Sequence, residues 1–470
     1  MSVRRILTVL TVVATLACWP LVARAAASQP ERRAASPSPA AAAASAAVSV
    51  EADFDNDGFA DLAVGVPREG VGSAELAGAV NVLDGSANGL SGAGSQLFVQ
   101  GGGGVSDTAE PFDLFGNALA AGDFDNDGFI DLAIGVPGED IGTLADAGAV
   151  TVLYGAASGL SAAGGQFFSQ DTPGVFGGAE PEDGFGSALG VGDFNNDTFA
   201  DLAIGVPSEG VGGASQAGAV NVLYGSAARL TATGNQQFFQ GNGGIGGVAE
   251  VGDAFGFVVT GGDFNNDSFD DLAIGVPFEN VGTVSDAGGI NVLYGSAADL
   301  ATTGNQQWLQ GSGGVAGVAE ENDFFGSALA AGDFDNDTFV DLAISAPFED
   351  VGSVLDAGAI NVLYGSTARL TATGNQQFFQ GSGGLVGVAE EGDFVGAALS
   401  TGDYNNDSFA DLAIGAPFED IGTLLDAGAI NVLYGSAGAL TTTGAQQFFQ
   451  GNGGVAGTRE EGDTFGSSLA

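Results

Sequence analysis

The sequence predicts an all-β fold of repeated four-stranded units, a β-propeller, and three observations support this. First, one aspartate pattern recurs every 70 residues from Asp53 to Asp403, and a fixed period of this size is typical of propellers, solenoids and bead arrays. Second, each module contains four short runs rich in branched, aliphatic or aromatic residues, which matches the four strands of a propeller blade. Third, 82 glycines among 470 residues indicate many turns and favour strands over helices.

The four predicted strands are clear in the module around Asp333. They are residues 325–330, 339–344, 359–364 and 376–380. Each run is bounded by Gly, Pro, Asn or Ser, so the runs are too short and too often interrupted for helices. A β-helix is the structural alternative, but its rungs are much shorter than 70 residues.

Six modules of 70 residues occupy positions 51–470, and the two ends of this array leave the blade count open. Residues 463–470 repeat the start of a module, whereas residues 48–50 stand where the first module lacks that start. In one interpretation the C-terminal strand completes blade one and closes a six-bladed ring, which removes exposed sheet edges. In the other, the chain is part of a seven-bladed propeller.

The N-terminal residues predict an exported protein. Arg4 and Arg5 precede a largely apolar stretch, residues 6–17, that is too short to span a bilayer comfortably, and residues 23–25 form an A-x-A cleavage site. We therefore expect a signal peptide at 1–25, an Ala/Ser/Pro-rich linker at 26–47 and the propeller at 48–470. Lipidation at Cys18 remains an open alternative. No later segment is apolar for long enough to cross a membrane, so we expect no transmembrane span in the mature chain.

The composition restricts the chemistry to oxygen ligands. The chain has no His and no Lys, nine Arg, one Cys and a formal net charge of −49. Catalysis by a Ser-His-Asp triad, metal binding by His and Schiff-base formation by Lys are therefore excluded. Nucleic acid is not an expected partner, because binding phosphates needs clustered Lys and Arg. Carboxylates, hydroxyls and carbonyls remain, and they are the ligands of hard cations such as Ca²⁺.

Every module carries the spacing D-x-[DN]-x-D-x-F-x-D. This spacing places Asp or Asn side chains at alternate positions of a tight loop. Alternate side chains point their oxygens inward, and the Phe can add its backbone carbonyl, which gives a cage suited to Ca²⁺. Carboxylates this close repel one another without a cation, so we expect up to six structural calcium ions. The predicted ligands are Asp53, Asp55, Asp57, Phe59 and Asp61; Asp123, Asp125, Asp127, Phe129 and Asp131; Asp193, Asn195, Asp197, Phe199 and Asp201; Asp263, Asn265, Asp267, Phe269 and Asp271; Asp333, Asp335, Asp337, Phe339 and Asp341; and Asp403, Asn405, Asp407, Phe409 and Asp411.

The six loops are not expected to be equivalent. The sixth position is Gly58 or Gly128 in the first two loops and Thr or Ser in the last four. If that position needs a positive φ, the last four loops are strained, and we expect the first two sites to bind better and the Asn-containing sites more weakly. The alternative interpretation is that the loops are Asp- and Asn-rich hairpin turns without an ion.

At these residues the chain resembles the FG-GAP repeats of integrin α-chain propellers and their bacterial relatives. The motif begins with Phe-Gly, as at Phe115-Gly116, continues with the Asp loop and ends with Gly-Ala-Pro, as at 415–417. The module starting at Val395 lacks the Phe. The resemblance implies a calcium-stabilised propeller with the cation loops on one face, between the first and second strands, and a role in binding or adhesion. Propellers of this family usually have seven blades.

Two long loops of each module are expected to share the opposite face, as residues 347–358 and 381–393 do. Long loops on rigid scaffolds often bind ligands. Each loop carries a recurring acid, and these acids form either a rosette around the axis or solvated loop charges and turn caps. They are Glu69, Glu139, Glu209, Glu279, Glu349 and Glu419, and Glu110, Glu180, Glu250, Glu320, Glu390 and Glu460. The Asp before each Phe-Gly step, such as Asp113, is expected to be a cap.

Three functional hypotheses follow. The first is a secreted or cell-surface binding and adhesion module with an extracellular protein or glycan as ligand. The second is a polysaccharide hydrolase or lyase that uses paired carboxylates. The third is a structural surface-coat protein. We favour the first hypothesis and expect no enzyme, because near-identical modules do not single out one active site.

Overall fold

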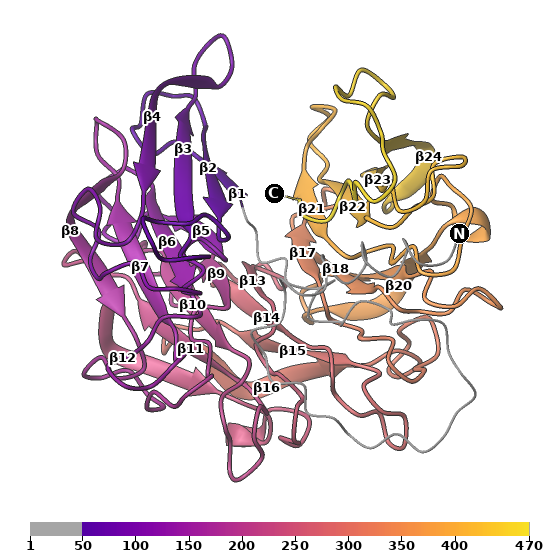
Figure 1. Ribbon diagram of the computed structural model, residues 1–470. Helices are drawn as coiled ribbons and strands as arrows, with labels where there is room; N and C mark the ends of the chain where they lie inside the picture. The colour runs from indigo at the N-terminus through magenta and orange to yellow at the C-terminus, as the bar shows by residue number, and fades with distance from the viewer. Residues whose placement is uncertain (1–48, 470) are drawn as a thin grey trace. The chain divides into compact units, whose positions relative to one another are not determined.

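The protein is a six-bladed β-propeller in the computed structural model, which describes residues 49–469 (Figure 1). Each blade is a four-stranded antiparallel sheet whose strands follow one another in sequence order. The blades follow one another in a ring, and the first strand of each contacts the first strand of the next from blade one to blade six. The predicted signal peptide, the linker and Cys18 lie outside the described residues.

The strands recur at equivalent positions in all six blades. The first strands are β1 (Ser49–Ala52), β5 (Leu119–Gly122), β9 (Ala188–Gly192), β13 (Val259–Gly262), β17 (Leu329–Gly332) and β21 (Leu399–Gly402). The second strands are β2 (Asp61–Val66), β6 (Asp131–Val136), β10 (Asp201–Val206), β14 (Asp271–Val276), β18 (Asp341–Ala346) and β22 (Asp411–Ala416). The third strands are β3 (Ala79–Asp84), β7 (Ala149–Tyr154), β11 (Ala219–Tyr224), β15 (Gly289–Tyr294), β19 (Ala359–Tyr364) and β23 (Ala429–Tyr434). The fourth strands are β4 (Ser91–Phe98), β8 (Ser161–Phe168), β12 (Thr231–Phe238), β16 (Ala301–Trp308), β20 (Thr371–Phe378) and β24 (Thr441–Phe448).

The hydrophobic core lies between neighbouring blades. The second and third strands of blade five are buried along their whole length, which explains their nearly continuous apolar sequences. Between blades two and three, Phe124 and Val152 pack in one cluster with Phe185 and Ile204. Because each blade buries its faces against its neighbours, the stability of a blade depends on the blades beside it.

The predicted strands agree with the structure in number and order, and differ at some ends. In blade five the third strand has the predicted bounds. The second begins at Asp341 rather than at Phe339, because Phe339 and Val340 still belong to the loop. The fourth runs over Thr371–Phe378 and begins five residues before the predicted start, because this outer strand is polar and largely open to solvent.

The structure confirms six blades, but the C-terminal segment does not complete blade one, so the predicted closure by that segment is wrong. Ser49 of β1 pairs with Val64 of β2 and supplies the first strand of that blade. Residues near the C-terminus lie against blade six instead, where the N–H of Phe465 donates to the carbonyl of Ala427 at 3.2 Å. This contact repeats the one that Phe115 makes with Ala77 at 2.9 Å on blade one.

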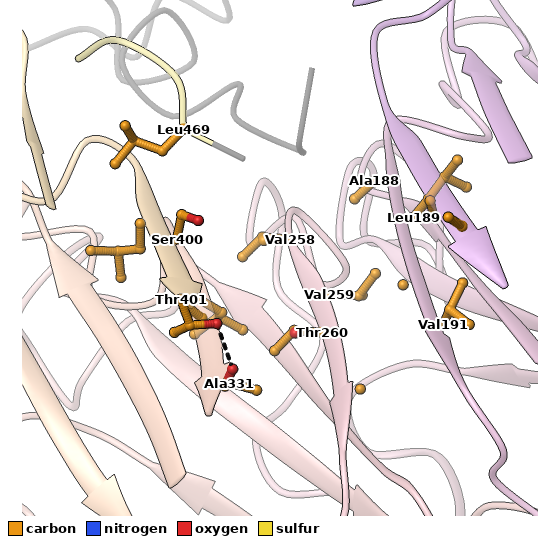
Figure 2. A pocket seen from close by; sticks show the side chains of 17 residues that line it. Ala188, Leu189, Val191, Val258, Val259, Thr260, Ala331, Ser400, Thr401 and Leu469 are labelled. Carbon is orange, nitrogen blue, oxygen red and sulfur yellow. Dashed lines mark hydrogen bonds between the residues drawn. The ribbon is translucent and has the colours of Figure 1, made fainter. Parts of the chain in front are cut away.

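The first strands of blades two to six surround a cavity of about 370 Å³ on the propeller axis. Figure 2 shows Leu189, Val259 and Thr401 among the side chains that face it, with the Thr401 hydroxyl donating to the carbonyl of Ala331 at 2.8 Å. The residues that line the cavity are Gly, Ala, Val, Leu, Ser and Thr. No acid of the described residues lines this cavity.

Candidate metal centres

The six aspartate loops connect the first and second strands of the blades and lie on one face of the propeller. Neighbouring loops are joined by backbone hydrogen bonds: the N–H of Ala200 donates to the carbonyl of Asp123 at 3.0 Å, and the N–H of Val340 donates to that of Asp263 at 3.1 Å. The same bond recurs between the loops of blades three and four and of blades five and six. Loops two to six therefore form a continuous row.

The first aspartate of each loop closes it around its own backbone. In blade three, Asp193 Oδ1 accepts from the N–H of Asp197 at 3.0 Å and Oδ2 accepts from that of Thr198 at 2.9 Å. The fifth-position carboxylate, Asp197 Oδ1, accepts from the N–H of Phe199 at 3.1 Å. Equivalent bonds recur in the other five loops. The backbone thus holds these carboxylates in fixed positions.

The ninth-position aspartate is buried and joins the loop to the end of the third strand. In blade three, Asp201 Oδ2 accepts from the N–H of Phe194 at 3.0 Å, and Oδ1 accepts from that of Gly225 at 2.9 Å. Burial raises the pKa of Asp201 to about 8, although both backbone hydrogen bonds favour the charged form. The same cause raises the pKa of Asp131 to about 7 and of Asp271 and Asp341 to about 8. A nearby cation would favour the charged carboxylates.

The structure brings acids together in three of the six loops. Carboxylate oxygens lie within 4.8 Å of one another in three groups of the described residues. The groups are Asp53, Asp55 and Asp57; Asp123, Asp125 and Asp127; and Asp333, Asp335 and Asp341. In the other three loops an Asn occupies the third position, so fewer carboxylates are available for such a group.

Oxygens at the third position lack hydrogen-bond partners in three loops. Asp125 Oδ1, Asn265 Oδ1 and Asp335 Oδ1 are buried and accept no hydrogen bond. A buried acceptor without a donor costs about 1–3 kcal/mol. Hard cations bind such oxygens, and the chemistry of the donor set therefore fits Ca²⁺.

The sixth position of every loop has a left-handed backbone. Gly58 and Gly128 have φ values of 91° and 92°, whereas Thr198, Ser268, Thr338 and Ser408 have φ values of 77°, 74°, 80° and 75°. The last four loops are therefore strained at this position, because only glycine adopts a positive φ without a steric cost. Whether this strain weakens cation binding stays a prediction.

Residues of the following blade modify two loops, which the sequence analysis missed. Arg229 Nε lies 3.5 Å from Asp125 Oδ2, and its guanidinium stacks 4.0 Å from the centre of the Tyr154 ring. Asn195 Nδ2 lies 3.4 Å from Asp299 Oδ1. The guanidinium of Arg229 from blade three thus offsets negative charge at the second loop, whereas Asp299 from blade four adds a carboxylate beside the third loop.

On the opposite face, one glutamate in each of blades two to six forms a hydrogen bond to the preceding blade. These five glutamates are buried, with exposed fractions of 1–8%. In each, Oε2 accepts from the side-chain amide of a glutamine in the preceding blade, at distances of 2.5–2.9 Å. The pairs are Glu139 with Gln100, Glu209 with Gln170, Glu279 with Gln240, Glu349 with Gln310 and Glu419 with Gln380. We call these the Glu–Gln pairs; the equivalent Glu69 of blade one is exposed.

The Glu–Gln pairs correct the sequence-based view of these acids as an axial rosette or as solvated charges. Burial raises the pKa of Glu139 to about 9 and that of Glu349 to about 7. The prediction that the Asp before each Phe-Gly step is a cap is confirmed. Asp113 Oδ2 accepts from the N–H of Glu110 at 2.5 Å, and the other five modules repeat this bond at 2.5–2.7 Å.

A six-bladed propeller with one acidic loop per blade defines the class of the protein, and comparison with known families identifies the repeat. The FG-GAP repeat matches six segments, residues 45–83, 115–153, 185–223, 255–292, 325–363 and 395–433. The chain belongs to the FG-GAP repeat family and has an integrin α-like propeller.

Curated relatives include an integrin alpha chain and phospholipases. The chain is 29% identical over 243 residues to integrin alpha-5 of Xenopus laevis, covering 49% of this chain and 20% of that protein. It is 39% identical over 116 residues to phosphatidylinositol-glycan-specific phospholipase D of Rattus norvegicus, covering 25% and 14%. It is 32% identical over 169 residues to the Bos taurus phospholipase, covering 36% and 19%. The chain thus spans a fifth or less of the length of these relatives.

Two solved structures share only a low similarity. A rhamnogalacturonan lyase of Bacillus licheniformis aligns with a TM-score of 0.37 over 84% of this chain and 57% of that chain, and the Dos1 propeller aligns with a TM-score of 0.39 over 84% and 72%. Both are 12% identical to this chain. These values carry no argument about function.

The expectation that the chain is no enzyme is contradicted by the comparisons. The relatives that match this chain include the phospholipases D named above, so near-identical modules do not exclude enzymatic activity. Within residues 49–469, no helix is long and apolar enough to cross a membrane.

Proposed function

We propose that the protein is an exported, calcium-binding FG-GAP propeller that acts as an extracellular or cell-surface binding and adhesion module. The family and the fold support a binding module. The observation that carries the calcium assignment is the set of buried, unpartnered oxygens at the third loop position, Asp125 Oδ1, Asn265 Oδ1 and Asp335 Oδ1. Up to six Ca²⁺ ions would be held by the side chains at the first, third, fifth and ninth positions and by the carbonyl of the Phe at the seventh.

The calcium ions would stabilise the propeller rather than contact the ligand. The ninth-position carboxylate is bonded to the backbone of the third strand, so an ion at the loop would fix the first three strands of its blade together. Binding of a ligand to the folded state alone stabilises it by about 2.7 kcal/mol at a hundredfold excess over Kd.

The ligand would be an extracellular protein or a glycan, bound on the face opposite the aspartate loops. The long inter-blade loops of this face expose apolar side chains beside acids, such as Val248, Val318 and Val388 with exposed fractions of 70%, 67% and 70%. Large exposed apolar groups on rigidly held loops are typical of binding surfaces.

Melting of the chelator-stripped protein with and without added CaCl₂ tests the calcium assignment, with MgCl₂ as the control ion. We expect calcium to raise the melting temperature and the resistance to protease, and magnesium to do so less. Unchanged melting and proteolysis after calcium addition would reject it. Binding to glycan arrays and to extracellular matrix proteins in calcium tests the adhesion role, and absence of binding to both would count against it.

A further inference from the structure

A hollow of about 560 Å³ lies against β12, the outer strand of blade three (Figure 1). The segments that join blade three to blades two and four supply most of the remaining lining, together with Thr302 of β16. The hollow shares no residue with the aspartate loops or with the axial cavity. None of its lining side chains carries a charge, although the chain has a net charge of −49. It is therefore a neutral surface on a strongly acidic protein.

An exposed aromatic ring, Phe176, stands in the lining of this hollow and occurs in one module alone. Its side chain is 57% exposed. The equivalent residues of the other five modules are not aromatic: Ser106, Gly246, Ala316, Val386 and Ala456. Because the other modules fold without an aromatic residue at this position, the ring is not needed for the packing of the blades.

The backbone of Phe176 is held in place by two buried asparagines of blade three. Its N–H donates to Asn235 Oδ1 at 2.7 Å, and its carbonyl accepts from Asn221 Nδ2 at 2.9 Å. Asn235 is 3% exposed and Asn221 is fully buried. The same two bonds hold Gly246 and Ala316 in the next two modules. The ring is thus added to a rigid backbone, which lowers the entropy cost of binding a ligand against it.

Uncharged hydrogen-bonding groups lie beside the ring. Asn242, Gln237 and Thr302 contribute two amides and a hydroxyl to the lining. Gln237 Nε2 has no hydrogen-bond acceptor, whereas the equivalent Gln307 of blade four donates to Glu279 at 3.2 Å. An amide offers both donors and an acceptor, so it can bind a ligand hydroxyl in either direction.

We propose that this hollow binds a neutral saccharide, with one sugar ring stacked on Phe176 and its hydroxyls hydrogen-bonded to the amides of the lining. The proposal rests on the proposed binding role and names the chemical class of the ligand. A sugar ring has a flat face of C–H groups and a rim of hydroxyls, so an aromatic ring beside amides is complementary to it. An anionic polysaccharide fits less well, because no cationic side chain lines the hollow and the net negative charge repels it.

Affinity electrophoresis and calorimetric titration of the full chain in CaCl₂ test this site. The probes are neutral oligosaccharides of glucose, mannose, galactose and xylose, with oligogalacturonate as the anionic comparison. We expect at least one neutral probe to bind, and Phe176→Ala to weaken that binding by about tenfold, since stacking on the ring is lost. Phe176→Trp, which keeps an aromatic face, should bind more tightly than Phe176→Ala.

The control variant is Val386→Ala, at the equivalent position between blades five and six, and it should bind the neutral probe as the wild type does. The Phe176 and Val386 side chains are 57% and 40% exposed, so all three variants should melt at the wild-type temperature. Neutral probes that bind Phe176→Ala as tightly as the wild type would overturn the site and would place glycan binding elsewhere on the propeller. Binding to matrix proteins alone, or to oligogalacturonate alone, would overturn the saccharide assignment while the adhesion role stands. A chain that binds neither glycans nor matrix proteins would refute the proposed function as well.

Discussion

Replacing the buried Asp201 by Asn tests whether the ninth-position carboxylate holds each blade together. Both of its oxygens accept backbone N–H groups, from Phe194 at 3.0 Å and Gly225 at 2.9 Å. Asn retains one acceptor and places an NH₂ group against the other backbone donor. At neutral pH the metal-free Asp201 is mostly protonated, because its pKa is raised to about 8, yet both of its oxygens can still accept. Asn leaves a buried donor unpaired, so we expect a loss of about 1–3 kcal/mol in the metal-free protein.

Hydrogen exchange and denaturant unfolding in chelator measure this loss. The amides of Phe194 and Gly225 should exchange faster in Asp201→Asn, and the denaturation midpoint should fall. Asp197→Asn, at an exposed position of the same loop, should change the midpoint much less without metal. If Asp201→Asn unfolds at the wild-type midpoint with both amides still protected, the carboxylate does not hold the third strand as described.

Three further predictions concern charge and backbone strain. The pKa values of buried aspartates such as Asp271 and Asp341 are raised to about 8. The stability that these groups contribute is therefore fully present below the ordinary value of 3.8 and is lost as pH rises toward 8. Melting in chelator from pH 5 to 8 should therefore show a decline that calcium reverses; a flat profile would contradict this. Ser268→Gly should stabilise the protein by about 0.5–1 kcal/mol, because it relieves the strain of a φ of 74°. Thr338→Gly should stabilise it less, because it also removes the hydrogen bond that Asn266 donates to the Thr338 hydroxyl at 2.7 Å. Equal shifts in melting temperature would refute this difference. Glu349→Gln should cost about 1–3 kcal/mol, because its two oxygens accept amides of Gln310 and Gln377, while Glu69→Gln at an exposed position should leave the melting temperature unchanged.

The 70-residue period predicted a propeller of four-stranded blades but left the number of blades open. The third strand of blade five, Ala359–Tyr364, was predicted with its observed bounds, because a buried strand has an apolar pattern that ends sharply at Gly365. The outer strand was harder to predict: Thr371–Phe378 begins with polar residues, and its backbone pairing leaves no mark in hydrophobicity. The spacing of the aspartates also predicted which carboxylates lie together in blades one, two and five.

The Glu–Gln pairs could not be predicted, because their members lie on different blades and 39 residues apart. A signal was present, since Gln100, Glu139 and their equivalents recur in the same register. Equal spacing alone does not show that two residues face each other, because the ring geometry decides which loops meet. The pairing of Arg229 with Asp125 was missed for the same reason.

The exposed Glu69 has a mechanical consequence. Five boundaries between neighbouring blades are each joined by a Glu–Gln pair. At blade one the equivalent acid, Glu69, is exposed. The glutamine equivalent to Gln100 in the last module, Gln450, instead donates to the carbonyl of Thr458 and to the carboxylate of Asp463 within its own segment. The structure gives no hydrogen bond between blade one and blade six within residues 49–469. Pulling or heating should therefore loosen these two blades first, and unfolding should spread from them to the blades between.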